Sequence, residues 1–411
     1  MRPAPARPES TSAPEPKALL GLRPRVWLMT FGHLAIDSNA AILFALLPLF
    51  VSHLHINFAQ AGALATILLM TSSVTQPLFG YVQDRRPAFP MSSLGLLVAG
   101  LAMGLTGFAA DYAQMIGLVL VAGIGVAAFH PQAVAQTARA SAARQAWGIA
   151  IFFTGGSTGT GIMTLIVVPL ATRFGPHATL VVLVPAVIAA ALFGRAYTSW
   201  IGPLAKEVGG ATAAASMRAV ALPLSMLLTV SILRSAVMTA YLTFLPTLVV
   251  FRTGNLGLGA AALAAFLFAG SLGALVGGAA AHRFGSAPVV VLSLAAGLLG
   301  LLPVPWLPAP VLVPWMFVAG ILMFASEAQV TALAQRLLTA FVGVASSLMM
   351  GVGLGIGNLG ALVTGAVADA RGIQLALTAT TFLMAGAIAA SIVYVMSMRD
   401  TDPAPFQEVK T

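Results

Sequence analysis

The chain has 411 residues, of which 59% are hydrophobic and 8% are charged, and its mean hydropathy is +0.97. Soluble domains carry about 25% charged residues, so this composition excludes a soluble protein and indicates one that crosses a membrane many times. The formal net charge is +9, and the absence of cysteine excludes a disulfide framework and thiol chemistry.

Residues 1–24 are rich in proline and alanine and include Arg2, Arg7, Lys17 and Arg23. They lack the short apolar stretch and small-residue cleavage site of a signal peptide. We therefore predict a disordered cytoplasmic tail here, and a second short tail over residues 398–411.

Twelve apolar stretches follow, most of them roughly 18–25 residues long, which is enough for a helix to span a bilayer. The prolines between Pro303 and Pro314 mark a short loop between the ninth and tenth stretches. The predicted spans have their cores at 26–51, 58–82, 91–110, 113–137, 147–171, 177–194, 219–250, 257–281, 287–304, 310–334, 340–367 and 373–397.

The basic residues give the orientation. With the N-terminus inside, 16 of the 20 Lys and Arg residues fall in cytoplasmic segments, whereas Arg173, Arg252 and Arg371 fall outside and Arg234 lies within a span. This bias follows the positive-inside rule, so we predict an inner-membrane (cytoplasmic-membrane) protein with both termini cytoplasmic. The excess of basic over acidic residues is therefore explained by the membrane topology, and no nucleic-acid partner is predicted.

The chain also contains a weak internal repeat. The longest internal loop, 195–218, separates six spans from six, so we predict an N-terminal half over 25–194 and a C-terminal half over 219–397. A substrate site is expected near the membrane midplane between them. The pairs that match at a shift of 198 residues are Pro48 with Pro246, Gly80 with Gly278, Arg85 with Arg283 and Arg173 with Arg371.

The loop after the second span reads Gly80-Tyr81-Val82-Gln83-Asp84-Arg85, and its counterpart holds Gly278 and Arg283. This loop resembles the G-x-x-x-D-[RK] signature of the major facilitator superfamily. The resemblance implies an all-α membrane protein with twelve transmembrane helices in two pseudo-symmetric six-helix halves. It also implies that Asp84 and Arg85 brace helix ends at a cytoplasmic gate. An ordinary basic loop is the alternative.

The chain further resembles the fosmidomycin-resistance branch of this superfamily. That resemblance implies proton-driven efflux of small toxic compounds, fosmidomycin being a phosphonate. The matching pieces are His33-Leu34 with Asp37, Gln76-Pro77 with Gly80-Tyr81, Phe129-His130-Pro131, Gly155-Gly156 with Gly159, Phe266-Leu267-Phe268-Ala269 with Gly277-Gly278, Ala334-Gln335 and Val367-Ala368-Asp369.

Ionisable residues inside the predicted spans are candidates for transport chemistry, because a charged group there costs ~3 kcal/mol or more. His33 and Asp37 are four residues apart and share one helix face, which suits proton coupling; a structural hydrogen-bonded pair is the alternative. His130 and Glu327 occupy equivalent positions of the repeat at a shift of 197. We expect them to meet across the central cavity, with local helix capping as the alternative.

Arg234 lies at nearly the same predicted depth as Asp37. A buried Arg must be paired or face water, and Asp37 and Glu327 are its candidate partners, with Asp37 preferred. The guanidinium suits a carboxylate or phosphonate, so Arg234 is a predicted substrate-binding residue, with Gln76, Tyr241 and His130 as polar company.

Several functions are excluded by the sequence. Residues 355–360 fit G-x-G-x-x-G but lie inside a span without a preceding strand, so they form no nucleotide site, and their glycines should let the helix pack closely. The chain has no Walker motif, no metal-ligand spacing and no nucleophile triad. We therefore predict no ATP, no cofactor, no metal and no enzymatic activity.

We predict a monomeric secondary transporter that works by alternating access on a small-molecule substrate and protons, within the lipid bilayer. Proton-coupled export of a small anionic or amphiphilic compound is the favoured activity. Uptake or exchange of an organic anion held by Arg234 is the alternative on the same fold. A non-transporting membrane sensor is disfavoured, because it would need a large soluble extension.

Overall fold

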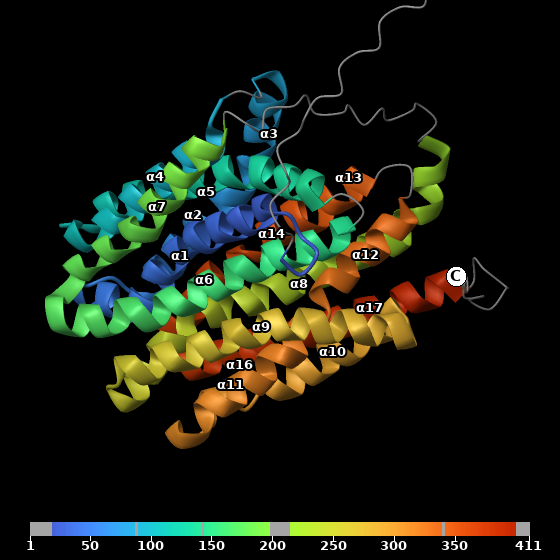
Figure 1. Ribbon diagram of the computed structural model, residues 1–411. Helices are drawn as coiled ribbons and strands as arrows, with labels where there is room; N and C mark the ends of the chain where they lie inside the picture. The colour runs from blue at the N-terminus through green and yellow to red at the C-terminus, as the bar shows by residue number, and fades with distance from the viewer. Residues whose placement is uncertain (1–18, 87–88, 142–143, 198–213, 339–341, 400–411) are drawn as a thin grey trace, which may run out of the picture.

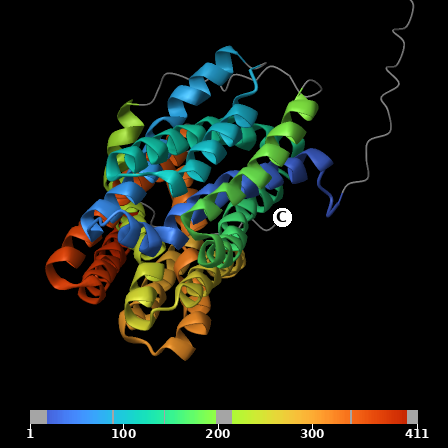
Figure 2. The ribbon, with the colours of Figure 1, turned by 90° about the vertical axis from the view of Figure 1, so that its left-hand side faces the viewer.

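The computed structural model describes residues 19–86, 89–141, 144–197, 214–338 and 342–399. Within these ranges the chain is helical apart from its loops and one isolated β-bridge between Leu19 and Leu22. The helices form two bundles. In Figure 1 the N-terminal half, blue to green, lies above the C-terminal half, yellow to red, and Figure 2 shows the same division from the side.

The N-terminal half contains α1 Pro24–His53, α2 Phe58–Val74, α3 Gln76–Arg85, α4 Met91–Leu105, η1 Thr106–Phe108, α5 Tyr112–Ser141, α6 Gln145–Phe174, η3 Gly175–Val182 and α7 Leu183–Tyr197. The C-terminal half contains α8 Ala214–Thr253, α9 Leu256–Phe284, α10 Ser286–Leu301, η4 Val304–Trp306, α11 Ala309–Phe324, α12 Glu327–Leu337, α13 Val342–Ser346, the π-helix η6 Ser347–Gly353, α14 Leu354–Gly357, α15 Leu359–Arg371, α16 Ile373–Thr381 and α17 Leu383–Arg399. Most of both predicted tails and the middle of the predicted 195–218 linker lie outside the described residues.

In the described ranges, 11 helical segments are long and apolar enough to cross a membrane. One of them, Trp147–Arg195, has 49 residues. At a rise of about 1.5 Å per residue it is more than twice as long as a bilayer core of about 30 Å requires. The chain turns back at Gly175, whose φ of 70° lies in the left-handed region that glycine tolerates. α6 and α7 are therefore separate crossings, and the twelve predicted spans are confirmed.

Four of the predicted spans are interrupted rather than continuous. The second span breaks at Thr75, because Pro77 in the first turn of α3 has no amide hydrogen to continue the helix. The tenth breaks before Glu327, and the twelfth breaks at Phe382. The eleventh contains the π-helix η6 and a further break at Asn358. π-helical turns are rare and often mark functional segments.

Glycines let the helices approach closely, as predicted. On α6, a side chain at Gly155 would meet the Thr30 carbonyl of α1 at 2.6 Å. On α14, a side chain at Gly357 would meet the Ile232 carbonyl of α8 at 2.7 Å. Helices in lipid gain little from the hydrophobic effect between themselves, so such close backbone contacts carry much of their packing.

The two halves meet along α1 with α8, α6 with α9, and α2 with α15. Deeper in this seam, the Thr66 hydroxyl donates to the Asn358 carbonyl at 2.9 Å. A side chain at Gly161 would meet the Phe268 ring at 3.0 Å. Closer to the outer ends of α2 and α15, side chains at Gly62 and Gly365 would collide with the Ala361 and Phe58 carbonyls, so the outer end of the seam is closed.

The orientation can be tested with single cysteines, because the chain has none of its own. A cysteine introduced at Thr253, at the predicted outer end of α8, should react with an impermeant maleimide added to intact cells. A cysteine at Ser12, which lies outside the described residues, should react only after the cells are opened. Labelling of Ser12→Cys in intact cells would contradict the predicted orientation.

Candidate functional site

Three predicted site residues meet where α1 and α5 pack together. The His33 Nε2 atom lies 3.2 Å from Asp37 Oδ2, and the His130 Nε2 atom lies 3.8 Å from Asp37 Oδ1. The two Nε2 atoms are 3.3 Å apart. His33 is buried, with 3% of its side chain exposed, whereas the Asp37 side chain keeps 29% of its surface exposed. We call His33, Asp37 and His130 the acceptor cluster.

Backbone carbonyls fix the tautomers of both histidines. His33 Nδ1 lies 2.7 Å from the Phe152 carbonyl oxygen, and His130 Nδ1 lies 2.8 Å from the Val126 carbonyl oxygen. A carbonyl oxygen only accepts hydrogen bonds, so each Nδ1 must carry the hydrogen. In a neutral imidazole the other nitrogen is then an acceptor, so both Nε2 atoms present lone pairs.

The acceptor cluster therefore lacks a donor of its own. Two Nε2 lone pairs and an ionised carboxylate point at one another within hydrogen-bonding distances. Unshared acceptors in such a place repel, whereas one proton placed between them makes a charge-assisted hydrogen bond. In the described part of the chain this is also the one group of His and acidic residues with ligand atoms close enough, within 4.8 Å, to hold a metal ion.

Aromatic rings and one glycine set the shape of the acceptor cluster. The His33 ring stacks on the Phe152 ring with centroids 4.2 Å apart, and the His33 and His130 rings meet edge to face. On α6, a side chain at Gly156 would come within 2.8 Å of His33 Nε2 and would also collide with Asp37. Gly156 is therefore required for the space that the acceptor cluster occupies.

The second charged group lies in the C-terminal half, where Arg234 of α8 pairs with Glu327 at the start of α12. The Arg234 Nη2 atom lies 3.5 Å from Glu327 Oε1, and 38% of the Glu327 side chain is exposed. Arg234 itself is buried, and its Nη1 faces the Met238 sulfur at 3.9 Å. Its Nε has no hydrogen-bond partner. A guanidinium has five N–H donors, so this one is left with unused capacity for an anion.

The preferred Arg234–Asp37 pair is wrong. Asp37 is already engaged by two histidines of its own half, whereas the break before α12 brings Glu327 against α8. The expected meeting of His130 with Glu327 is not found either, because each has an ion-pair partner from its own half. The repeat gives them equivalent positions, and equivalent positions need not face each other.

Tyr241 is a packing residue rather than a binding one. Its side chain is fully buried, and its hydroxyl bonds with the Leu301 carbonyl at 2.8 Å and with the Thr381 hydroxyl at 2.9 Å. These bonds leave no surface for a substrate. Gln76 is half-buried at the start of α3, and its role in binding stays a prediction.

The gate-loop residues also stay predictions. Arg85 lies over the Tyr81 ring at 4.7 Å, and Arg283 lies over the Phe284 ring at 5.3 Å, so both exposed guanidinium groups stack on neighbours of their own helices. The Asp84 side chain lies outside what the structure describes. Gly80 approaches Pro131 of α5, whereas Gly278 faces open space.

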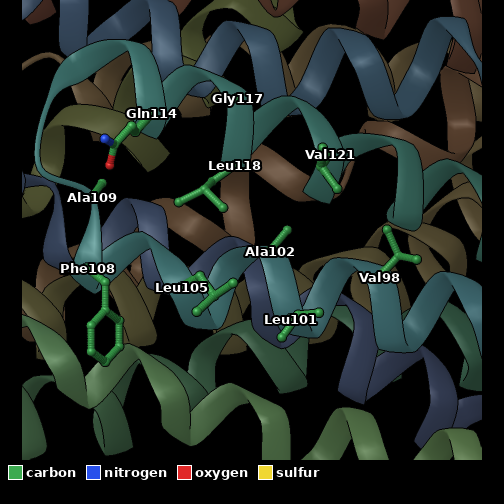
Figure 3. A pocket seen from close by; sticks show the side chains of 10 residues that line it. All are labelled: Val98, Leu101, Ala102, Leu105, Phe108, Ala109, Gln114, Gly117, Leu118 and Val121. Atoms are coloured by element: carbon green, nitrogen blue, oxygen red, sulfur yellow. The ribbon is translucent and has the colours of Figure 1, made fainter.

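A separate hollow of about 670 Å³ lies between α4 and α5 (Figure 3). Its lining includes Leu101, Phe108 and Leu118, and its one polar side chain, Gln114, accepts a hydrogen bond from the Ala110 amide. Leu101 and Phe108 are exposed on the membrane-facing surface. The hollow therefore faces lipid and contains none of the charged site residues.

Comparison with known proteins agrees with this architecture. The family model for the Major Facilitator Superfamily matches residues 29–357, which is most of the chain. The chain belongs to the major facilitator superfamily, and the predicted family and fold are confirmed.

Two curated bacterial proteins are similar along most of their length. The chain is 28% identical to the uncharacterized MFS-type transporter YfnC of Bacillus subtilis (strain 168), over 85% of this chain and 88% of that protein. It is 24% identical to the Fosmidomycin resistance protein of Escherichia coli (strain K12), over 86% and 89%.

Solved transporters share the fold at low identity. A bacterial homologue of the human lysosomal transporter Spinster superimposes with a TM-score of 0.74 at 14% identity, covering 93% of this chain and 98% of that one. The nucleoside transporter NupG superimposes with a TM-score of 0.70 at 15% identity, covering 91% and 99%. At identities of 14% and 15%, these matches establish a shared fold and no more.

Double-mutant cycles can test the two separate clusters. We expect Asp37→Asn and His130→Ala to be coupled by ~0.5–3 kcal/mol in the free energy of unfolding in detergent, because the residues are in contact. His130→Ala and Glu327→Gln should add within ~0.5 kcal/mol, because each has a different partner. Coupling of the second pair with additivity of the first would contradict the observed partners.

Proposed function

We propose that this protein is a proton-coupled secondary transporter that exports a small anionic or amphiphilic compound by alternating access. The observation that carries the proposal is the convergence of three acceptor groups, two imidazoles and one carboxylate, in the acceptor cluster. Membership of the superfamily and similarity to a protein named for fosmidomycin resistance support it. The proposed setting is the inner membrane, with both termini cytoplasmic and the chain acting as a monomer.

The acceptor cluster supplies the proton step. When it holds a proton, that proton supplies the missing donor and makes a charge-assisted hydrogen bond between two members of the cluster, such as His33 and Asp37. When the proton leaves, the partly exposed Asp37 carboxylate accepts a donor group of the substrate instead. Proton and substrate donor thus compete for the same acceptors, and competition for one site is what exchange transport requires. An inward-moving proton then drives the substrate outward.

Arg234 supplies the anion step from the other half. Its guanidinium has an unpaired Nε and a long ion pair with Glu327, so a carboxylate or phosphonate can take its place through two parallel hydrogen bonds. The favoured substrate therefore carries an anionic group and, elsewhere, a hydrogen-bond donor.

Uptake of an organic anion is a second candidate, and the Arg234–Glu327 pair favours it. A proton on Glu327 would remove the charge that holds Arg234 and leave the guanidinium for the anion. Proton and anion would then bind together, which drives both in the same direction. The two candidates therefore predict opposite directions of movement under one pH gradient.

Proteoliposomes with an imposed pH gradient test the proposal. With fosmidomycin and a panel of small anions as probes, substrate should move uphill against the proton flow, in the presence of a chelator that removes adventitious metal. Asp37→Asn should abolish uphill movement and keep downhill exchange, because an amide keeps the shape of the side chain but carries no proton. Movement in the same direction as protons would favour uptake, and full uphill activity in Asp37→Asn would remove Asp37 from coupling.

Arg234→Lys is the matched test of the anion step. Lysine keeps the charge and loses the planar pair of donors, so an anionic probe should bind at least about tenfold more weakly, whereas a neutral amphiphile should bind as before. The tenfold figure follows because a hydrogen bond to a charged group contributes roughly 1.5–3 kcal/mol. Equal affinity for the anion in both proteins would contradict a role for Arg234.

A further inference from the structure

Asp369 joins the two halves at the predicted outer end. It lies near the end of α15, and its Oδ1 and Oδ2 accept hydrogen bonds from the backbone amides of Phe58 and Ala59, each at 2.8 Å. These amides are the first two of α2, 311 and 310 residues away in the chain. In the part of the chain that the structure describes, Asp369 makes no ion pair, so its carboxylate is committed to α2.

The two amides are the ones that α2 cannot satisfy by itself. The first N–H groups of a helix have no partner within it. Asn57 forms a capping box with Gln60, accepting from the Gln60 amide while its own amide donates to the Gln60 side chain. The Ala61 amide donates to the Asn57 carbonyl. Only the Phe58 and Ala59 amides remain, and the carboxylate from the other half takes both.

Electrostatics strengthens this contact. A carboxylate at a helix N-terminus is favoured by the helix dipole, and hydrogen bonds to a charged acceptor are shorter and stronger than neutral ones. The contact also lies where the backbones of the halves touch. Side chains at Gly62 and Gly365 would collide with the Ala361 and Phe58 carbonyls respectively, so only glycine lets α15 come close enough for Asp369 to reach α2.

We propose that Asp369 is the latch of the outer gate, and that it must release both α2 amides before the transport site opens outward. Its meaning for transport rests on the proposed alternating-access cycle. When α2 separates from α15, both hydrogen bonds are broken, and the two amides and the carboxylate must bind water in their place. The latch therefore biases the empty protein toward the outward-closed arrangement.

Spin-label distances can test the latch without substrate or pH gradient, so the result is independent of the proposed function. Ser52→Cys and Thr253→Cys place the only two cysteines at the outer ends of α1 and α8, one in each half, where both residues are exposed. The otherwise unmodified protein should show mainly the short distance. Asp369→Ala should shift the closed-to-open ratio by roughly tenfold or more, because two charge-assisted hydrogen bonds are lost.

Two controls flank this variant. Asp111 also accepts from a helix amide at the outer end, that of Gln114, but within its own half. Asp111→Ala should therefore leave the distances unchanged. Gly62→Ala leaves the carboxylate intact and presses on the Ala361 carbonyl, so it should lengthen the distance as Asp369→Ala does.

Asp369→Asn keeps one acceptor oxygen and should give an intermediate shift, which decides the question if Asp369→Ala does not fold. Unchanged distances in the folded Asp369 variant, with Gly62→Ala showing the long distance, would overturn the latch. An equal shift in Asp111→Ala would do so as well, because any lost cap would then open the gate.

Discussion

Three acceptor groups that face one another inside a membrane need a proton, and this constraint governs the rest of the site. The Phe152 and Val126 carbonyls fix both Nδ1 hydrogens, so His33 and His130 can offer only lone pairs to Asp37. The cost of that convergence is removed by a proton or by a substrate donor. On this basis we propose that proton and substrate are coupled through α1 and α5, and that an anion is recognised by α8.

The packing serves this arrangement at two places. Gly155 and Gly156 bring α6 onto α1, which puts the Phe152 carbonyl and ring beside His33 and leaves room for the carboxylate. At the outer end of α2 and α15, glycines bring the halves together where Asp369 binds the α2 amides. In both places glycine lets two helices approach closely, and this short separation allows a polar contact that larger residues would prevent.

The sequence was sufficient to predict the spans, the two halves and which ionisable residues lie within the spans. These features follow from the apolar stretches and from the distribution of basic residues, both of which are local properties of the chain. It predicted that His33 and Asp37 share a helix face, since four residues separate them. It named Asp37 and Glu327 as candidate partners of Arg234 but did not rank Glu327 first, because the break before α12 has no periodicity signal in an apolar stretch. Nor did it separate Tyr241 from the site, since a buried hydroxyl and a binding hydroxyl look alike in sequence.

The decisive measurement is the number of protons exchanged when a substrate binds. The strongest binder from a panel that includes fosmidomycin would be added to detergent-solubilised protein in weakly buffered solution with an indicator dye, over a range of about pH 5.5 to 8.5 around neutrality. If substrate and proton compete for the acceptor cluster, binding should release up to about one proton per bound molecule, and the affinity should rise with pH to a matching extent. Asp37→Asn should release none. Net proton uptake on binding, or the same release from Asp37→Asn, would contradict this competition.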